Sequence, residues 1–210
     1  PFSDIQQLKG KEIGLTGNPG GTNDRTMRLI LREAGLNPER DVKLIYAGDP
    51  PLLFSAFTSA GRFDAMFVSL PFPVLAEQKG YRILINAAEK VEIPLSGLAV
   101  TTETLKTHRE QVKRVVKAHV EAQRFIKSNK GATLDVMVDW LGLDRSIASR
   151  AYELYIPVVA QRATVAREGT RRVLELEADS GVRLKISDVD KLVDATIAEE
   201  VNRGLELRTE

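Results

Sequence analysis

Residues 17–22, with the sequence GNPGGT, are the part of the chain best suited to binding a ligand. The glycines allow a tight turn and a close approach of the backbone to a bound molecule. A strand pattern precedes this loop and an amphipathic helix pattern follows it, and Thr22 or Asn23 can cap that helix. Bare amides at a helix start, together with the helix dipole, form an anion site. The loop therefore predicts that a small anionic or polar molecule binds here.

Other interpretations of this loop remain open. No Gly-Lys-Ser/Thr sequence follows, so the loop is not a phosphate-binding P-loop, and the glycine spacing is not G-x-G-x-x-G. On geometry alone, a tight turn with a capping residue between a strand and a helix explains the same residues and is the more frequent case. The residues of this loop that we nominate for ligand binding are Asn18, Gly20, Gly21, Thr22 and Asn23.

Three further residues are candidates for the same site. Ser69 and Phe72 follow a short apolar strand pattern, where Ser69 can donate a hydrogen bond and Phe72 can supply an apolar wall. The alternative is a plain strand end before a helix that begins with a proline. Gly97 precedes another strand pattern, and a glycine there permits either a close approach of the backbone to a ligand or only a bend.

Side chains that could carry catalysis or bind metal are scarce. The chain has no cysteine, which excludes thiol catalysis, disulfides and cysteine-ligated metals. His108 is expected in solvent, and His119 falls on the apolar face of a long helix pattern, which predicts a core position. Neither histidine has a second one at metal-binding spacing. We therefore expect no enzymatic activity, no metal and no cofactor.

Other conspicuous side chains have simple structural explanations. The tryptophan Trp140 is expected to anchor a helix junction. Four arginines are expected on solvated helix faces: Arg28, Arg32, Arg171 and Arg172. The acidic pairs in the last third of the chain do not form an acid–base pair, because their members are adjacent or lie on different helix faces: Glu175 with Glu177, and Glu199 with Glu200.

Composition places the chain among soluble globular proteins. Of its 210 residues, 43% are hydrophobic and 28% are charged. The 30 basic and 29 acidic residues give a net charge of +1, which favours neither nucleic acid nor an anionic membrane as partner. No apolar run reaches the ~20 residues of a membrane span. The chain begins with Pro1 and shows no signal peptide, so we expect a processed product or a piece of a longer protein.

The candidate residues require a scaffold, and the first half of the chain predicts an α/β one. Strand patterns alternate with helix patterns through residues 1–102, which is typical of a mostly parallel sheet with helices on both faces. Ligands of such sheets bind outside the carboxyl ends of the strands. The five strands are expected at residues 11–16, 42–46, 65–68, 81–85 and 98–100.

Residues 103–210 predict a helical segment. The expected helices include a long one that carries Val112 and Ile126, and shorter ones at 132–141, 146–155, 165–178 and 188–201. Ser187 and Asp188 are the expected cap of the last helix. Several of these helices carry apolar stripes that one five-stranded sheet does not obviously cover. They cover one another, or they pack on a sheet outside the chain.

The order of several motifs resembles a known family. Residues 4–14, DIQQLKGKEIG, resemble the start of the second lobe of periplasmic solute-binding proteins. The relevant family serves ABC importers of the nitrate, sulfonate and taurine type, and its superfamily includes thiamine-pyrimidine-synthase-like members. The resemblance spans residues 4–157. Further matches follow in the same order: GGT at 20–22, REAGLNPERDV at 32–42, GRFDA at 61–65, SLPFP at 69–73 and SGLAVTT at 96–102.

The resemblance implies a two-lobed clamshell of the type II periplasmic-binding fold. Residues 1–102 would form the second, ligand-binding lobe, and residues 103–210 would pack on a first lobe absent from the chain and on the hinge. The implied function is the capture of a small organic anion, such as a sulfonate or carboxylate, by hinge closure, and its delivery to a membrane permease. The implied location is the periplasm or a lipid-anchored position outside the cytoplasm, with no nucleic acid bound and no direct membrane insertion.

Two alternatives share this fold. One is an enzyme such as the menaquinone-pathway lyases, which would need a titratable group in the cleft. The other is the effector-sensing domain of a transcription regulator, which would need a helix-turn-helix upstream. Thiamine-pyrimidine synthases use Cys and His clusters that this sequence does not contain, which argues against their enzymatic branch.

Overall fold

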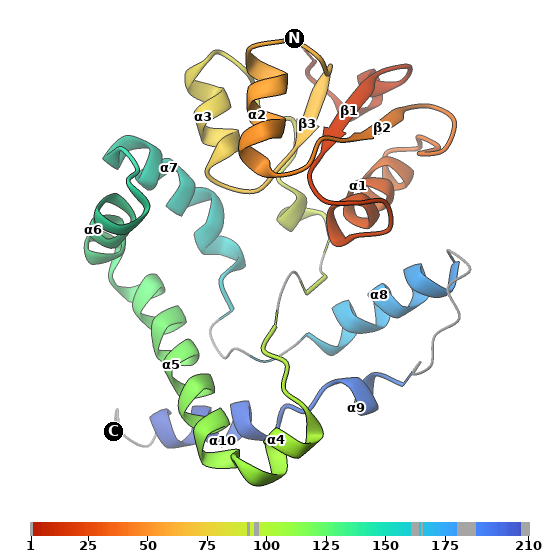
Figure 1. The fold of residues 1–210 in the computed structure, drawn as a ribbon. Helices are drawn as coiled ribbons and strands as arrows, with labels where there is room; N and C mark the ends of the chain where they lie inside the picture. The colour runs from red at the N-terminus through yellow and green to blue at the C-terminus, as the bar shows by residue number, and fades with distance from the viewer. Residues whose placement is uncertain are drawn as a thin grey trace. The chain divides into compact units, whose positions relative to one another are not determined.

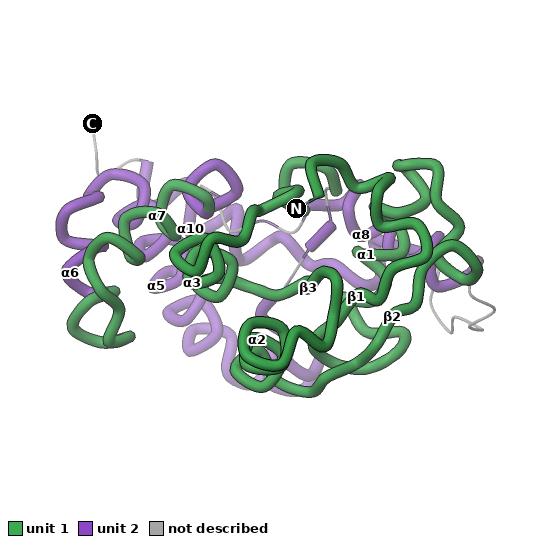
Figure 2. Tube along the Cα trace, turned by 90° about the horizontal axis from the view of Figure 1, so that it is seen from above, with its two compact units in different colours: residues 1–91, 137–154 green, residues 92–136, 155–210 purple. Residues whose placement is uncertain are grey.

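The computed structural model describes residues 2–91, 93–94, 97–160, 164, 166–179 and 188–206. The chain forms two compact units, each built from two stretches (Figure 2). The first unit comprises Pro1–Val91 and Met137–Leu154, and the second comprises Glu92–Val136 and Tyr155–Glu210. Within the described ranges, no helix is both long enough and apolar enough to cross a membrane. The predicted lobe boundary at residue 102 stays a prediction.

The first unit contains a parallel sheet with β1 at its centre (Figure 1). The strands are β1 (Glu12–Leu15), β2 (Lys43–Tyr46) and β3 (Ala65–Phe67), in the order β2-β1-β3. Leu15 pairs with Tyr46 on one side and with Phe67 on the other, so the three strands end at one edge. The sequence predicted these three strands to within one or two residues.

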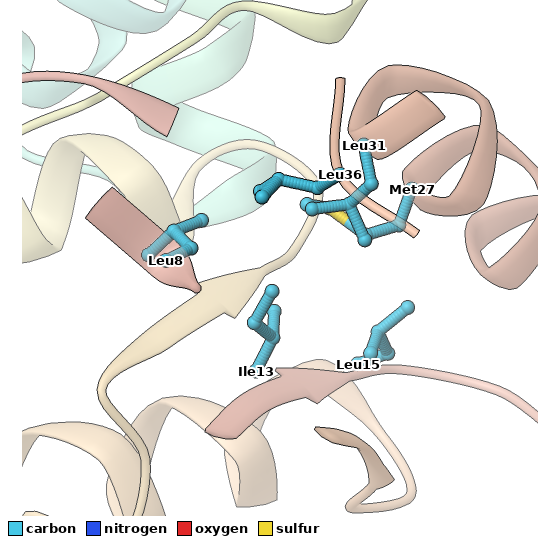
Figure 3. Close-up of a cluster of buried hydrophobic side chains, with 6 residues drawn as sticks. All are labelled: Leu8, Ile13, Leu15, Met27, Leu31 and Leu36. Carbon is cyan, nitrogen blue, oxygen red and sulfur yellow. The ribbon is translucent and has the colours of Figure 1, made fainter. Parts of the chain in front are cut away.

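Helices cover both faces of this sheet, as the sequence predicted. On one face, Ile13 and Leu15 of β1 point towards Met27 and Leu31 of α1 (Thr22–Glu33), as Figure 3 shows. The other face is covered by α2 (Pro50–Thr58), whose Leu53 and Phe57 form a second core with Phe63. Alternation along β1 therefore sends Ile13 and Leu15 to one core and Gly14 to the other.

Gly14 allows α2 to pack tightly on β1. A Cβ atom at this position would lie 2.5 Å from Cδ1 of Leu53 and 2.8 Å from Cδ2 of Phe63. Leu53 is fully buried and Phe63 nearly so, which leaves neither side chain much room to move. The space that a side chain at position 14 would need is therefore occupied by residues of the helix and loop that cover this face.

The prediction of five strands is wrong for the described residues, where the sheet has three. Residues 81–85 and 98–100 have extended sequence patterns but form no strand, and Ser96 lies outside the described residues. Leu84 still packs on the core beneath α1, and the ring of Tyr81 lies 4.6 Å from that of Phe57. A strand exists only when a neighbour completes its hydrogen bonds, and local sequence cannot show whether such a neighbour is present.

Further short elements complete the first unit. Asp4 caps the 3₁₀ turn η1 (Ile5–Leu8) by accepting a bond from Gln6 N. Past the sheet come α3 (Phe72–Gln78) and the 3₁₀ turn η2 (Ala87–Glu89). Helix α7 (Arg145–Tyr155) packs on α3 through Val74, Ile147 and Ala151. The Arg150 guanidinium donates two bonds of 3.1 Å to the Glu77 carboxylate.

The described part of the second unit is helical, as predicted. Helices α5 (Arg109–Ser128) and α10 (Thr196–Glu206) pack together through Val120, Ile197 and Val201. Asn202 is fully buried there, accepts a bond of 3.1 Å from Arg124 and donates one of 2.7 Å to the Ala198 carbonyl. The elements are α4 (Thr102–Thr107), α5 (Arg109–Ser128), α6 (Lys130–Leu141, shared with the first unit), η3 (Ile156–Val158), α8 (Arg167–Asp179), α9 (Val189–Leu192) and α10 (Thr196–Glu206).

The last predicted helix is two helices. Asp188 caps α9 by accepting a bond from Asp190 N, which confirms half of the predicted cap, while Ser187 lies outside the described residues. The helix then ends, and Asp194 accepts bonds of 2.9 Å and 2.6 Å from the amide and hydroxyl of Thr196. An Asp side chain that bonds to nearby amides competes with the helical ladder, so it starts a new helix here.

Candidate functional site

The candidate residues of the first unit meet at the carboxyl edge of the sheet. The chain leaves β1 for β2 on one side and returns past β1 to β3 on the other, so β1 and β3 flank a topological switch point. Residues 17–21 follow β1 and residues 68–71 follow β3, which brings both predicted loops to this edge. Ligands of parallel α/β sheets bind at this kind of position.

Internal hydrogen bonds hold the loop after β1. Gly17 N donates to the Gly48 carbonyl at 3.2 Å, which ties the loop to the segment that follows β2. Gly21 N donates to the Asn18 carbonyl at 3.0 Å, and Gly20 N donates to Oδ2 of Asp24 at 2.7 Å. The expectation that Gly20 and Gly21 offer bare amides is therefore wrong, because both already have an acceptor within the loop and helix.

The start of α1 also differs from the expected cap. Gly21 is the N-cap residue, and no side chain caps the helix. Thr22 begins the helix, while the Asn23 side chain donates to the Thr16 hydroxyl at 2.6 Å. The helical ladder starts with Arg25 N, which donates to the Gly21 carbonyl at 3.0 Å. The preceding amides of the first turn, those of Thr22 and Asn23 among them, lie outside that ladder.

A buried carboxylate beneath this turn was missed by the sequence analysis. The side chain of Asp24 is only 4% exposed, and its Oδ1 accepts bonds of 2.6 Å from both Tyr46 Oη and Arg28 Nε. Arg28 also donates to Glu39 at 2.5 Å. The prediction that Arg28 lies on a solvated face is therefore wrong. The i, i+4 spacing of Asp24 and Arg28 was the signal that could have indicated the pair.

Electrostatics keep this carboxylate charged. Burial raises the pKa of Asp24, but hydrogen bonds from Tyr46, Gly20 and Arg28 outweigh it and bring the pKa below its usual value. Burial lowers the pKa of Arg28, and its bonds to Tyr46 and Asp24 raise it overall. Burial and the bond to Asp24 raise the pKa of Tyr46. At neutral pH the group is therefore an ionised Asp24 and Arg28 beside a neutral phenol.

The second candidate loop presents an aromatic pair. The ring of Phe72, at the start of α3, lies 5.5 Å from the ring of Phe54 in α2, tilted by 50°. Both rings are half-buried, and Ser69 is exposed. Phe54 was missed by the sequence analysis, because one phenylalanine in an apolar helix looks like a core residue. Gly97 is exposed and belongs to the second unit, so the structure does not group it with the other seven candidates.

Three expectations about other side chains need correction or comment. His119 is exposed rather than buried, with Nε2 3.2 Å from Nε2 of Gln123. The α5 side chains that form a core with Ile197 and Val201 of α10 are those of Val112, Val116 and Val120. Trp140 is 83% exposed, so it does not anchor a junction. Among the residues that the structure describes, no three His, Asp or Glu side chains gather in a way that could hold a metal ion.

Comparison with curated proteins finds binding proteins of Brucella. One from Brucella abortus (strain 2308) is 29% identical to the chain over 150 residues, which cover 69% of the chain and 45% of the relative. A protein of Brucella suis biovar 1 matches with the same identity and coverage. The chain thus spans about half the length of the curated relatives it matches.

Comparison with solved structures finds the same fold in larger proteins. The alkanesulfonate-binding protein SsuA of Xanthomonas axonopodis pv. citri, bound to MOPS, matches with a TM-score of 0.67 and 16% identity over 88% of this chain and 62% of its own. The periplasmic aliphatic sulphonate-binding protein SsuA of Escherichia coli matches with a TM-score of 0.69 and 16% identity, over 94% of this chain and 67% of its own. DszB in complex with biphenyl-2-sulfinic acid matches with a TM-score of 0.63 and 12% identity, over 97% of this chain and 73% of its own. At such identities the likeness shows the fold alone.

The family comparison covers most of the region in which the sequence motifs were found. The match to the NMT1-like family extends over residues 3–142, two thirds of the 210 residues. It includes both candidate loops, at residues 17–22 and 69–72. The SsuA structures share the fold that the predicted resemblance implies. The chain belongs to the NMT1-like family.

Proposed function

We propose that this chain is the ligand-binding part of a solute-binding protein that serves an ABC importer and carries out no chemistry. The observation that supports this most is the meeting of two loops at the switch point between β1 and β3. One loop ends in the first-turn amides of α1, and the other leads to an aromatic pair. The binding-protein relatives and the fold of SsuA agree with such a role.

The chemistry of the two loops favours a small organic anion. The amides of Thr22 and Asn23 and the hydroxyl of Thr22 can donate to an oxyanion, such as a sulfonate or carboxylate. Ser69 adds an exposed hydroxyl from the second loop. Phe72 and Phe54 offer an apolar wall to the remainder of the molecule. A ligand with an anionic head and an apolar body matches this set better than an inorganic ion does.

Capture would follow from closure of the protein around this molecule. Contacts that exist only in the closed state shift the population towards closure, and the closed form then docks on a membrane permease. The periplasm is the proposed location, by analogy with the periplasmic Escherichia coli protein of the same fold. In the second unit, Val115 and Phe125 of α5 are exposed apolar residues, and we propose that they pack on a further lobe of the whole protein.

Calorimetry tests this function with the protein in its full natural length. The panel contains methanesulfonate, MOPS, octanesulfonate, benzoate, nitrate and a pyrimidine, and we expect binding of at least one organic anion. Thr22→Val should weaken that binding, because it removes a donor while it keeps the shape of the side chain. Thr107→Val is the matched control at the end of α4. Absence of heat with every member of the panel would contradict the proposal.

An enzyme is the second candidate, because the fold is shared with the enzyme DszB. Mass spectrometry of the bound molecule after long incubation with the protein separates the two functions. A solute-binding protein returns the molecule unchanged, whereas an enzyme converts it. If the protein converts the molecule, and Thr22→Val slows this turnover whereas Thr107→Val does not, then the function is catalysis at the same edge of the sheet.

A further inference from the structure

The Asp24 carboxylate holds the loop at residues 17–22. An ionised carboxylate has no hydrogen to donate, so it is not itself a donor to an anion. Asp24 Oδ2 accepts the Gly20 amide at 2.7 Å, four residues back along the chain. Asp24 Oδ1 accepts bonds of 2.6 Å from Tyr46 and from Arg28. Both oxygens of the carboxylate are therefore used, and both bind groups that shape the loop and its helix.

The partners come from three separate segments. Gly20 belongs to the loop, Arg28 lies one turn further along α1, and Tyr46 is the last residue of the neighbouring strand β2. Arg25 adds a fourth contact, because its Nε donates to the Gly20 carbonyl at 2.6 Å. The two peptide groups on either side of the Gly20 Cα are thus both held, one through its amide by a carboxylate and the other through its carbonyl by a guanidinium.

Gly20 needs these contacts to keep a single conformation. Its φ of +79° lies in the left-handed region, and a glycine visits many other conformations when nothing holds it. Gly17 in the same loop has a φ of +84°. A loop with two such glycines loses much entropy when it is ordered, so an unheld loop would have to be ordered by the ligand at the expense of affinity.

We propose that Asp24 and Tyr46 are positioning residues that set the loop at residues 17–22 before a ligand arrives. Asp24 binds the Gly20 amide, and Tyr46 fixes the Asp24 carboxylate to the edge of the sheet. The amides of Thr22 and Asn23 then keep one direction at the start of α1. Neither positioning residue touches the ligand. The expected effect on affinity rests on the proposed function, whereas the effect on the conformation of the loop does not.

Amide hydrogen exchange in the ligand-free protein at full natural length tests the structural content. Asp24→Asn keeps the shape of the side chain but removes its charge and one acceptor oxygen. We expect the Gly20 amide to exchange roughly ten- to a hundredfold faster, as suits the loss of a hydrogen bond to a charged group. Tyr46→Phe should act on the same amide more weakly. The double variant should exchange no faster than Asp24→Asn, because both changes act through one carboxylate.

Glu77→Gln is the matched control. It also turns a carboxylate that binds an arginine, Arg150, into an amide, and it lies in the same unit on α3. It should leave exchange at Gly20 unchanged. Calorimetry with MOPS and octanesulfonate then measures the consequence, and we expect Asp24→Asn to bind about tenfold more weakly than Glu77→Gln.

The outcomes separate the inference from the function. Unchanged exchange at Gly20 in Asp24→Asn overturns the inference, and so does equally faster exchange at all amides of the first unit, which indicates a general loss of stability. Faster exchange at Gly20 with undiminished affinity overturns the positioning role. If the wild-type protein binds neither sulfonate nor any other member of the panel, the proposed function fails, while the exchange data still decide whether Asp24 and Tyr46 hold the loop.

Discussion

The hydroxyl of Tyr46 donates a hydrogen bond of 2.6 Å to Oδ1 of Asp24 and thereby joins the end of β2 to the first turn of α1. The two residues are 22 positions apart in the sequence. The contact brings a buried charge to the carboxyl edge of the sheet, where the two candidate loops meet. We therefore expect both the stability in acid and the conformation of the loop at residues 17–22 to depend on this one carboxylate.

Acid should reduce the free energy of unfolding through Asp24. Burial raises its pKa, but the bonds from Tyr46, Gly20 and Arg28 lower it below the ordinary value of 3.8. The unfolded chain therefore takes up this proton at a higher pH than the folded chain. The stabilisation is complete above the ordinary pKa and is lost as the pH falls through the lower pKa of the folded state.

Urea unfolding of the wild type and of Asp24→Asn, from about pH 7 to about pH 3, measures this effect as a difference. The wild type should be the more stable protein at neutral pH, and the gap should narrow in acid. A gap that stays constant over this range would show that the ionisation of Asp24 contributes nothing to folding.

Gly14→Ala should destabilise the first unit. The new methyl group would collide with Leu53 and Phe63, which are packed too tightly to move aside. Overpacking of this kind costs about 1–3 kcal/mol. Urea unfolding measures the loss. Gly131→Ala in α6 is the control, because a Cβ atom added there would meet no atom within 4 Å outside its own helix, and alanine favours a helix by up to about 1 kcal/mol.

Asp49→Ala should weaken the start of α2. The Asp49 carboxylate accepts a bond of 2.9 Å from Leu52 N and caps the helix. Loss of such a cap costs about 0.5–2 kcal/mol. Asp49→Asn keeps an acceptor oxygen in place and should retain most of the stability in thermal unfolding. Equal losses in the two variants would show that charge, rather than the capping bond, is what Asp49 contributes.

Phe72→Ala should change which anions bind, if the proposed function holds. Phe72 and Phe54 form the apolar wall near the second loop, so their effect should grow with the apolar length of the ligand. We expect about a tenfold loss of affinity for octanesulfonate and little change for methanesulfonate. Trp140→Ala in α6, where the side chain is 83% exposed, serves as the control. An equal loss for both sulfonates would place Phe72 away from the apolar part of the ligand.

Much of the first unit could be predicted because its signals are local. The alternation of Ile13 and Leu15, the spacing of Met27 and Leu31, and the glycine after β1 each depend on neighbours within a few residues. These patterns predict strands, helices and turns, and the rules for parallel sheets then place the loops after β1 and β3 at one edge. The helical character of the later residues was predictable for the same reason.

Several of the errors concern contacts between distant segments. Residues 81–85 have a strand pattern but no strand pairs with them in the described structure. His119 lies on a helix pattern that looked apolar, yet it is exposed, and α10 packs with Val112, Val116 and Val120 instead. Neither outcome is encoded in a window of ten residues, because strand pairing and helix packing depend on the partner that the rest of the chain supplies.

By itself, the sequence determined that a glycine-rich loop stands between a strand and a helix, and that a second loop with Phe72 follows a later strand. The tertiary structure alone decided which donors of that loop stay available. Only the folded chain brings Tyr46 beside Asp24, and the carboxylate so placed takes up the Gly20 amide. A buried charge can be hydrogen-bonded by a residue at any distance along the chain, so its partner is decided by the folded structure and not by the local sequence.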